Sequence, residues 1–264
     1  MKILTLTLCV ATLLAGQIPT AQAALMVDRT RLIFNESEKS ISINVTNRNT
    51  RDPYLAQGWM EDSKGQKISG PLMVLPPVQR IEPDSKTVMR LQGLPDIAKL
   101  PKDKESVFYF NLREIPPKNE KPNVLTLAMQ TRLKVFYRPE ALRVDYAEDV
   151  LPGTTTLTLT RQGDSYVVNN PTPYHYTFVE ARASVKAPGI ESFEPIMVEP
   201  ASSMPLNVAG LGNAPVLMFI NDYGSQRLLP FNCTGSTCKA GKVVVPDRSA
   251  ETGTREAEKL GSAS

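Results

Sequence analysis

The chain has few of the residues from which catalytic and metal sites are commonly built. Its 264 residues include one His, three Cys and one Trp, and the aromatic residues together make up 6%. One imidazole and three thiols do not make a His-rich metal site, a catalytic His pair or a zinc ribbon unless carboxylates supply the missing ligands. The formal net charge of +3 is too small to indicate nucleic-acid binding.

Sequence motifs for phosphate binding and nucleophilic catalysis are missing as well. The sequence contains no G-x-S-x-G, G-x-x-x-x-G-K, H-E-x-x-H or G-x-G-x-x-G. The one histidine, His175, stands in a loop that leads into an expected strand, and we interpret it as a surface or turn residue. We therefore expect no enzyme activity, no cofactor and no metal. A hydrophobic content of 41% is ordinary for a globular chain.

The first 23 residues have the pattern of a secretory signal peptide. Lys2 precedes an apolar run over residues 3–15, and a small-x-small site ends at Ala23. The apolar run is too short to cross a bilayer, so we expect it to be removed rather than to anchor the protein. Cleavage also removes Cys9. It leaves Cys233 and Cys238 in an oxidising compartment, where we expect them to form a disulfide across a hairpin turn.

Short apolar or alternating segments recur through the rest of the chain, separated by Pro and Gly. Expected strands are residues 31–34, 40–45, 87–91, 106–112, 123–137, 155–160, 165–169, 176–179 and 216–220, with one short turn in 95–104. A break falls between Pro139 and Pro152. This spacing predicts an all-β chain of two tandem antiparallel β-sandwiches, followed by a polar flexible tail. The expected domains are residues 24–143 and 144–245, and the tail is 246–264.

Several longer motifs are more specific than a generic sandwich. They are DRTR (28–31), PYLAQ (53–57), PPVQR (76–80), FYFNLREIPP (108–117), LKVFYRP (133–139), NPTPY (170–174) and INDYG (220–224). In this order they resemble the periplasmic pilus-assembly chaperones of the PapD-like family, over essentially the whole chain after the signal peptide. The resemblance implies two immunoglobulin-like domains set at an angle and a location in the periplasm.

The resemblance also implies a site for the C-terminal carboxylate of a pilin subunit. In that family an Arg of the first strand and a Lys of the last strand of domain one anchor this group, and the matching residues are Arg31 and Lys134. Two converging cations would give charge-assisted hydrogen bonds to one carboxylate. Without the flanking motifs, both would be interpreted as ordinary exposed strand cations.

A second implied site is the strand that begins near Asn123. Leu125, Leu127 and Met129 alternate with smaller or polar residues, so one face carries large apolar groups. Alternation alone leaves open whether these residues fill the core of the domain. The resemblance implies instead that they complete the fold of a pilin that lacks its last strand, while Val124 points to the core.

Two structural groups are implied by the same resemblance. Glu105, Arg138 and Asp222 match residues that link the two domains by salt bridges, and we expect these pairs to be exposed and to set the domain orientation rather than to add stability. The Cys233–Cys238 pair matches the disulfide of the second domain. The short loop 116–122 resembles the family members that assemble rod-like pili.

We therefore predict a chaperone that binds, folds and caps pilin subunits and delivers them to an outer-membrane usher. The expected partners are the pilins and the usher, with no nucleic acid, and the chain itself is expected not to be membrane-embedded. The alternative is a structural pilus or adhesin subunit built from immunoglobulin-like domains.

Overall fold

The structure is a computed structural model that describes residues 23–118, 127–145 and 149–246. Residues 1–22 of the expected signal peptide, residues 247–264 of the expected tail, and Val124 and Leu125 lie outside the described residues. The described part consists of strands joined by loops and short 3-10 turns, and no helix in it has the length and hydrophobicity to cross a membrane.

The first half of the chain folds into two sheets packed face to face. One sheet has the order β1-β3-β8-β6, and the other has the order β2-β10-β9-β4-β5, with β7 also paired to β4. Their bounds are β1 Leu25–Val27, β2 Arg31–Asn35, β3 Ser40–Asn47, β4 Tyr54–Glu61, β5 Lys67–Ile68, β6 Leu72–Leu75, β7 Val78–Ile81, β8 Lys86–Gly93, β9 Ser106–Ile115 and β10 Gln130–Arg138.

Alternation along the strands builds the core of this first unit. In β3, Ile43 and Val45 are buried while Ser42 and Asn44 are exposed, as expected for a strand with one face on the core. The buried side chains of both sheets, among them Phe34 of β2, meet in a single hydrophobic cluster. The first unit is therefore a β-sandwich.

The second half forms a separate sandwich with a core of its own. Its strands follow the order β14-β13-β16-β17-β18-β11-β12-β15, and β17 connects the two halves because it pairs with both β16 and β18. The bounds are β11 Thr158–Gln162, β12 Ser165–Asn170, β13 Tyr176–Arg182, β14 Ile196–Val198, β15 Ser202–Pro205, β16 Val216–Ile220, β17 Gln226–Thr234 and β18 Thr237–Ala240. Aromatic residues such as Tyr166, Phe178 and Phe219 fill its centre.

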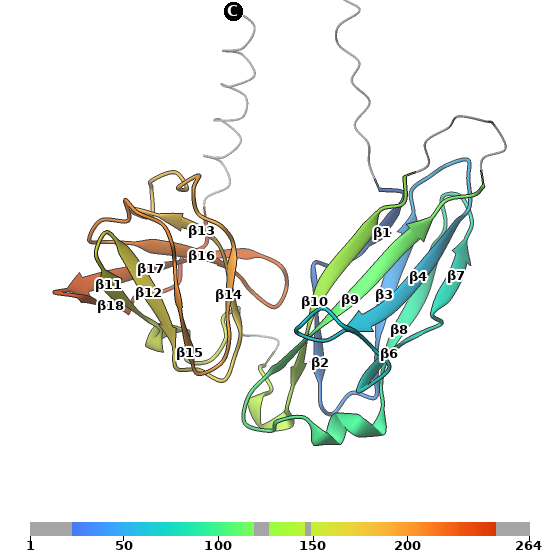
Figure 1. Cartoon of the computed structure of the whole chain (residues 1–264), viewed down its shortest axis with the longest axis horizontal. Helices are drawn as coiled ribbons and strands as arrows, with labels where there is room; N and C mark the ends of the chain where they lie inside the picture. Colours follow the sequence, from blue (N-terminus) through green and yellow to red (C-terminus); the bar gives the residue numbers. More distant parts are fainter. Residues whose placement is uncertain (1–22, 119–126, 146–148, 247–264) are drawn as a thin grey trace, which may run out of the picture.

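The two units lie side by side, and strand β10 of the first is on the side that faces the second (Figure 1). The predicted fold class, two tandem β-sandwiches, is confirmed. The disulfide is confirmed as well: Cys233 and Cys238 face each other in the β17–β18 hairpin and are bonded. The turn expected in residues 95–104 is a 3-10 helix, η1, over Pro95–Lys99.

Two of the expected strands begin later than the sequence pattern predicts. Residues 154–156 form a 3-10 turn, η3, in which the Thr156 backbone N–H and hydroxyl both donate to the carbonyl of Gly153, so the strand begins at Thr158. The long strand expected from residue 123 is described as a strand only from Gln130. Before it, Met129 accepts a single backbone hydrogen bond from Glu114, with no continuous ladder.

Candidate functional site

Strands β2 and β10 place two cations side by side. The two strands pair in parallel, and Lys134 is in register with Arg31. In-register residues of neighbouring strands point to the same face of the sheet. This face is the one that meets the second unit, because Arg31 and Lys134 each donate a hydrogen bond to a residue of that unit.

Arg31 is held against the second unit but keeps unused hydrogen-bonding capacity. Its Nη1 donates to the carbonyl oxygen of Ile220 at 2.8 Å, and its guanidinium carbon lies 5.9 Å from the centre of the Phe136 ring. Its Nε is buried and has no hydrogen-bond partner among the described residues. Burial lowers the pKa of Arg31 to about 10, although Asp222 and Glu105 act in the opposite direction.

Lys134 carries a positive charge that its surroundings do not neutralise. Its Nζ donates to the hydroxyl oxygen of Thr177 in β13 at 3.1 Å. Burial, followed by the positive charges of Arg31 and Arg132, lowers the pKa of Lys134 to about 8. A bound anion would relieve this repulsion and restore the ordinary pKa. The pair therefore favours the binding of an anion.

A second cationic residue, Arg138, lies four positions beyond Lys134 on the same face of β10. Arg138 donates from Nε and Nη2 to Glu105 Oε1 at 2.9 and 2.7 Å, and from Nη1 to Asp222 Oδ2 at 2.6 Å. Burial disfavours the charge of Arg138, but hydrogen bonds and charges from Asp222 and Glu105 outweigh it and raise the pKa. Asp222 belongs to the second unit, so these ion pairs join the two units.

The expectation that this trio is exposed is wrong. The side chains of Arg138, Glu105 and Asp222 are 3%, 1% and 23% exposed. The interface between the two units covers them, and this interface cannot be seen in the pattern of any single strand. Buried ion pairs of this kind differ from surface pairs, because removal of one partner leaves an unpaired buried charge.

The interpretation of His175 as a surface residue is also wrong. It is 7% exposed, and its backbone N–H donates to Glu105 Oε2 at 2.8 Å while its Nδ1 lies 3.2 Å from the same oxygen. Alternation around β13 offered a signal: since Tyr176 points into the core of the second unit, His175 must point away from it. The alternation of side chains does not show which residues cover His175 on that side.

The apolar residues before β10 lie on the surface where they are described. Leu127 is 65% exposed and Met129 is 44% exposed, so neither fills the core of the first unit. Leu125 lies outside the described residues. Strand β10 pairs with β9 from Gln130 but with β2 only from Lys134. Within the described residues, one edge of β10 from Gln130 to Leu133 therefore has no neighbouring strand.

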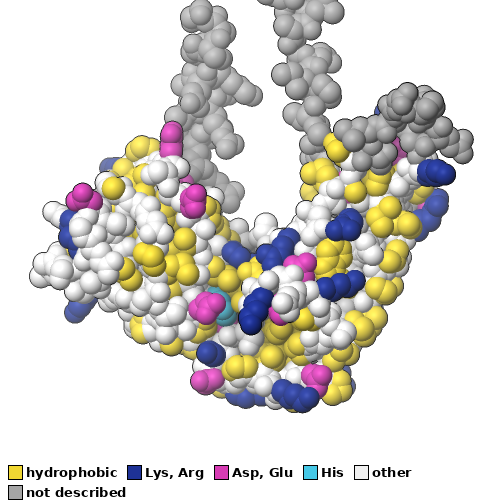
Figure 2. Space-filling model, viewed as in Figure 1, with side chains coloured by type: hydrophobic (Ala, Val, Ile, Leu, Met, Phe, Trp, Pro, Cys, Tyr) yellow, Lys and Arg dark blue, Asp and Glu magenta, His cyan; other side chains and the backbone are white. Residues whose placement is uncertain are grey.

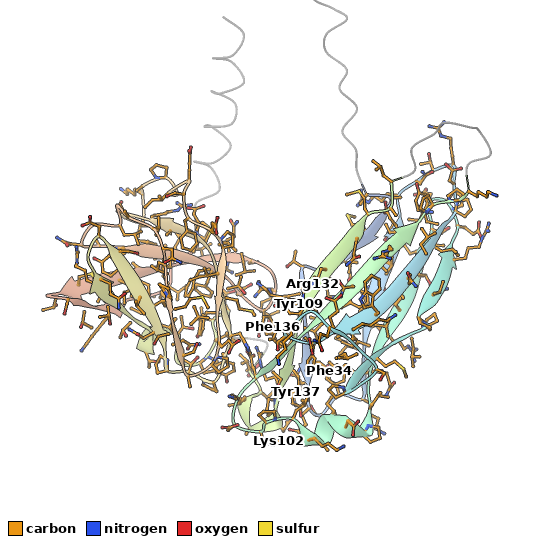
Figure 3. All side chains as sticks on the ribbon, in the orientation of Figure 1. Phe34, Lys102, Tyr109, Arg132, Phe136 and Tyr137 are labelled. Carbon is orange, nitrogen blue, oxygen red and sulfur yellow. A yellow bond between two sulfur atoms is a disulfide. The ribbon has the colours of Figure 1, made fainter. Side chains whose placement is uncertain are left out.

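A row of stacked cations and aromatic rings on the same sheet face was not anticipated from the sequence. The Arg132 guanidinium lies 3.4 Å from the centre of the Tyr109 ring, and its Nε donates to Glu61 at 3.0 Å. Arg113 lies over the Trp59 ring at 5.1 Å. Figure 3 shows Arg132, Tyr109 and Phe136 on the side of the first unit that faces the second.

These residues give the junction between the two units a cationic surface. Figure 2 shows Lys and Arg side chains gathered where the units meet, around the single His. A cleft of about 390 Å³ lies beside this junction, with Arg31 and Arg138 in its walls, but its lining also carries the carboxylates Asp28, Glu38, Asp145 and Asp222 and includes neither Lys134 nor His175. The cleft is therefore mixed in charge, and the pair formed by Arg31 and Lys134 is the feature that favours an anion.

Comparison with known proteins points to one family. Residues 24–143 match the model described as pili and flagellar-assembly chaperone, PapD N-terminal domain, and residues 153–230 match pili assembly chaperone PapD, C-terminal domain. The chain is 48% identical over 229 residues to the probable fimbrial chaperone YfcS of Escherichia coli strain K12, covering 87% of this chain and 90% of the relative. It is 45% identical over 223 residues to the chaperone protein PapD of Escherichia coli, covering 84% and 92%.

Solved structures agree with these matches. The CupB2 chaperone of Pseudomonas aeruginosa superposes with a TM-score of 0.64 at 29% identity, over 78% of this chain and 98% of that chain. The periplasmic chaperone SfaE gives a TM-score of 0.61 at 28% identity, over 76% and 95%. Since both halves of the chain match one family of chaperones rather than of enzymes, this protein belongs to the PapD-like family of pilus-assembly chaperones.

Proposed function

We propose that this pilus-assembly chaperone acts in the periplasm, where it captures pilin subunits by their C-terminal carboxylate and completes their fold with its own strand. The observation that supports this most directly is the in-register pair Arg31 and Lys134, two half-buried cations that form no salt bridge with any carboxylate of the described residues. The alternative of a structural pilus subunit is not favoured, because the relatives matched along most of the chain are chaperones.

The carboxylate fits this pair on chemical grounds. The Arg31 guanidinium has terminal N–H groups beyond the one that Ile220 takes, and Lys134 Nζ has three donors of which Thr177 takes one. A carboxylate has two oxygens that can accept from both cations at once, and a half-buried setting strengthens such charge-assisted bonds. A free C-terminus carries a negative charge and a second acceptor oxygen, both of which an internal peptide group lacks, so the pair would select the end of a chain.

Next to this anchor, the exposed segment before β10 provides the strand. Leu127 and Met129 would enter a groove on the pilin together with Leu125, while the open edge of β10 from Gln130 to Leu133 continues the backbone pairing. In such strand addition, the main chain gives affinity and alternate side chains give register. Burial of three large apolar side chains contributes on the order of 5 kcal/mol before ordering costs.

The remaining parts of the proposal concern organisation and delivery. We assign residues 1–23 to a signal peptide, 24–143 and 144–245 to the two domains, and 246–264 to a tail. The captured subunit passes to an outer-membrane usher, with no nucleotide required, since binding to the chaperone itself supplies the strand that the pilin lacks. Fractionation separates this function from the alternative: a chaperone stays in the periplasmic extract, whereas a pilus subunit leaves with sheared fibres.

The anchor is tested by co-purification of the chaperone with the pilins encoded beside it. Arg31→Ala and Lys134→Ala are expected to abolish capture while the melting temperature stays within a few degrees of wild type. Lys86→Ala and Arg90→Ala are matched controls, because both are exposed cations on β8 of the opposite sheet. Wild-type yield of pilin with either anchor variant would disprove the assignment.

A further inference from the structure

The start of β13 contacts the first unit at two points on one face. Tyr176 and Phe178 are buried in the core of the second unit. The alternate residues, His175 and Thr177, point the other way, toward the first unit, where they contact Glu105 and Lys134. His175, just before β13, and Thr177, within it, thus hold the second unit against the first.

Strand β10 meets these two residues with an alternating face of its own. Lys134 donates to Thr177, and the ring of Phe136, two residues on, lies 5.4 Å from the ring of His175. Arg138, two residues further, binds the same carboxylate that His175 binds. The contacts therefore follow the alternation of side chains along both segments. His175 lies between the contact of Thr177 with Lys134 and the contact of Arg138 with Glu105.

Glu105 receives hydrogen bonds from both units on different oxygens. Arg138 of the first unit occupies Oε1, whereas Oε2 lies within reach of the backbone N–H and of Nδ1 of His175. A carboxylate oxygen can only accept, so Nδ1 carries hydrogen in this contact. The Glu105 backbone N–H in turn donates to the carbonyl of Pro173 at 3.0 Å. Glu105 is thus fixed from both sides.

We propose that His175 is a positioning residue for the carboxylate site. Its hydrogen bond to Glu105 fixes the start of β13, and with it the Thr177 hydroxyl that lies against Lys134. Loss of the Nδ1 donor would let the second unit shift and would misplace both Thr177 and the cation it orients. The effect on client binding rests on the function proposed above, whereas the effect on domain orientation can be measured without a client.

Two variants separate the hydrogen bond from the packing of the ring. His175→Phe keeps a ring beside Phe136 but has no donor, and His175→Asn keeps an N–H near the position of Nδ1. Domain orientation is measured on the full chain by residual dipolar couplings. The binding probe is an N-acetylated peptide of alternating valine and serine with a free C-terminal carboxylate, compared with the same peptide as its carboxamide.

We expect His175→Phe to change the orientation of the two units and to weaken the carboxylate peptide about tenfold, with little effect on the carboxamide. His175→Asn should restore both properties to within about twofold of wild type. Wild-type orientation and peptide preference in His175→Phe, or equal defects in both variants, would overturn the proposal. If His175→Phe does not fold, His175→Leu takes its place with the same expected result.

The two proposals fail in different ways. A wild-type protein that binds the carboxylate and the carboxamide equally well would contradict the anchor function of Arg31 and Lys134. The dipolar couplings of the two His175 variants would still decide whether this residue sets the orientation of the units.

Discussion

The fold disfavours the charged form of Lys134, and an anionic ligand would favour that form. Burial and the neighbouring charges of Arg31 and Arg132 lower its pKa to about 8. Its one hydrogen-bond partner, the hydroxyl of Thr177, carries no charge. A carboxylate at this position would stabilise the ammonium form and raise the pKa again. On the proposed function, binding of a client carboxylate and protonation of Lys134 are therefore expected to be linked.

The affinity for a client is consequently expected to depend on pH. Below about pH 8 the ammonium form of Lys134 prevails and the carboxylate binds; above it the free protein loses this charge, so the affinity falls. If only the charged form binds, one pH unit above the pKa weakens binding about tenfold. Calorimetric titration with a pilin C-terminal peptide between about pH 7 and about pH 9 measures this.

Lys134→Arg is the matched control for this titration. A guanidinium at position 134 keeps its charge throughout the range, so the pH dependence should flatten even if the absolute affinity drops. An unchanged affinity of the wild-type protein across the range would show that the charge of Lys134 does not contribute to binding.

At the level of elements, strand β10 combines a structural face and a functional face. Leu133, Val135 and Tyr137 point into the core of the first unit. The residues between them point outward and make the contacts described above. Because a strand alternates strictly, a shift of one residue in the β2–β10 register would exchange the two faces. The five in-register pairs between β2 and β10 therefore also position the cations.

Mutations in the exposed segment just before β10 should affect pilin capture without affecting the stability of the protein. Leu127→Glu and Met129→Glu are expected to abolish pilin capture, because a charge cannot enter an apolar groove, and to leave the melting temperature nearly unchanged, because both side chains are already exposed. Val88→Glu is the control, since Val88 is 45% exposed on the opposite sheet. A large drop in melting temperature in either variant would instead indicate a role in the fold.

Alternation located nine of the eighteen strands in the described residues, including β3, β9 and β16, and missed the other nine, among them the long strands β4 and β17. It could not give the parallel pairing of β2 with β10, because the paired residues Arg31 and Lys134 are 103 positions apart in the sequence. Arg31 and Lys134 were proposed as a site through family resemblance, because an isolated Arg and Lys look like surface cations. His175 was missed, because its partner Glu105 belongs to another domain and no local pattern connects the two.

For the molecule as a whole, the contact between the two units is ionic rather than hydrophobic at its centre. Arg138 binds Glu105 of its own unit and Asp222 of the other, with little exposure to solvent. Such a cluster adds little net stability when complete but is costly to break. Its value is therefore in the geometry it imposes on two sandwiches that each have their own core.

Arg138→Met should accordingly be strongly destabilising. The substitution leaves Glu105 buried without its cation, so unfolding is expected to become easier by about 3 kcal/mol. Asp222→Asn should cost less, because Asp222 is partly exposed and water can compensate. Arg80→Met, which breaks an exposed pair with Glu82, should change nothing measurable. Urea denaturation of the three variants gives the order; equal effects for Arg138→Met and Arg80→Met would contradict this account.

The parallel pairing of Arg31 with Lys134 also bears on when the protein becomes active. A ribosome makes residue 31 long before residue 134, and the carbonyl of Ile220 and the hydroxyl of Thr177 come later still. The proposed anchor is thus incomplete until all of these residues have been brought together. If this pair is the anchor, the chain can capture a carboxylate only after both of its units have folded and docked, so its own folding must precede its activity on other proteins.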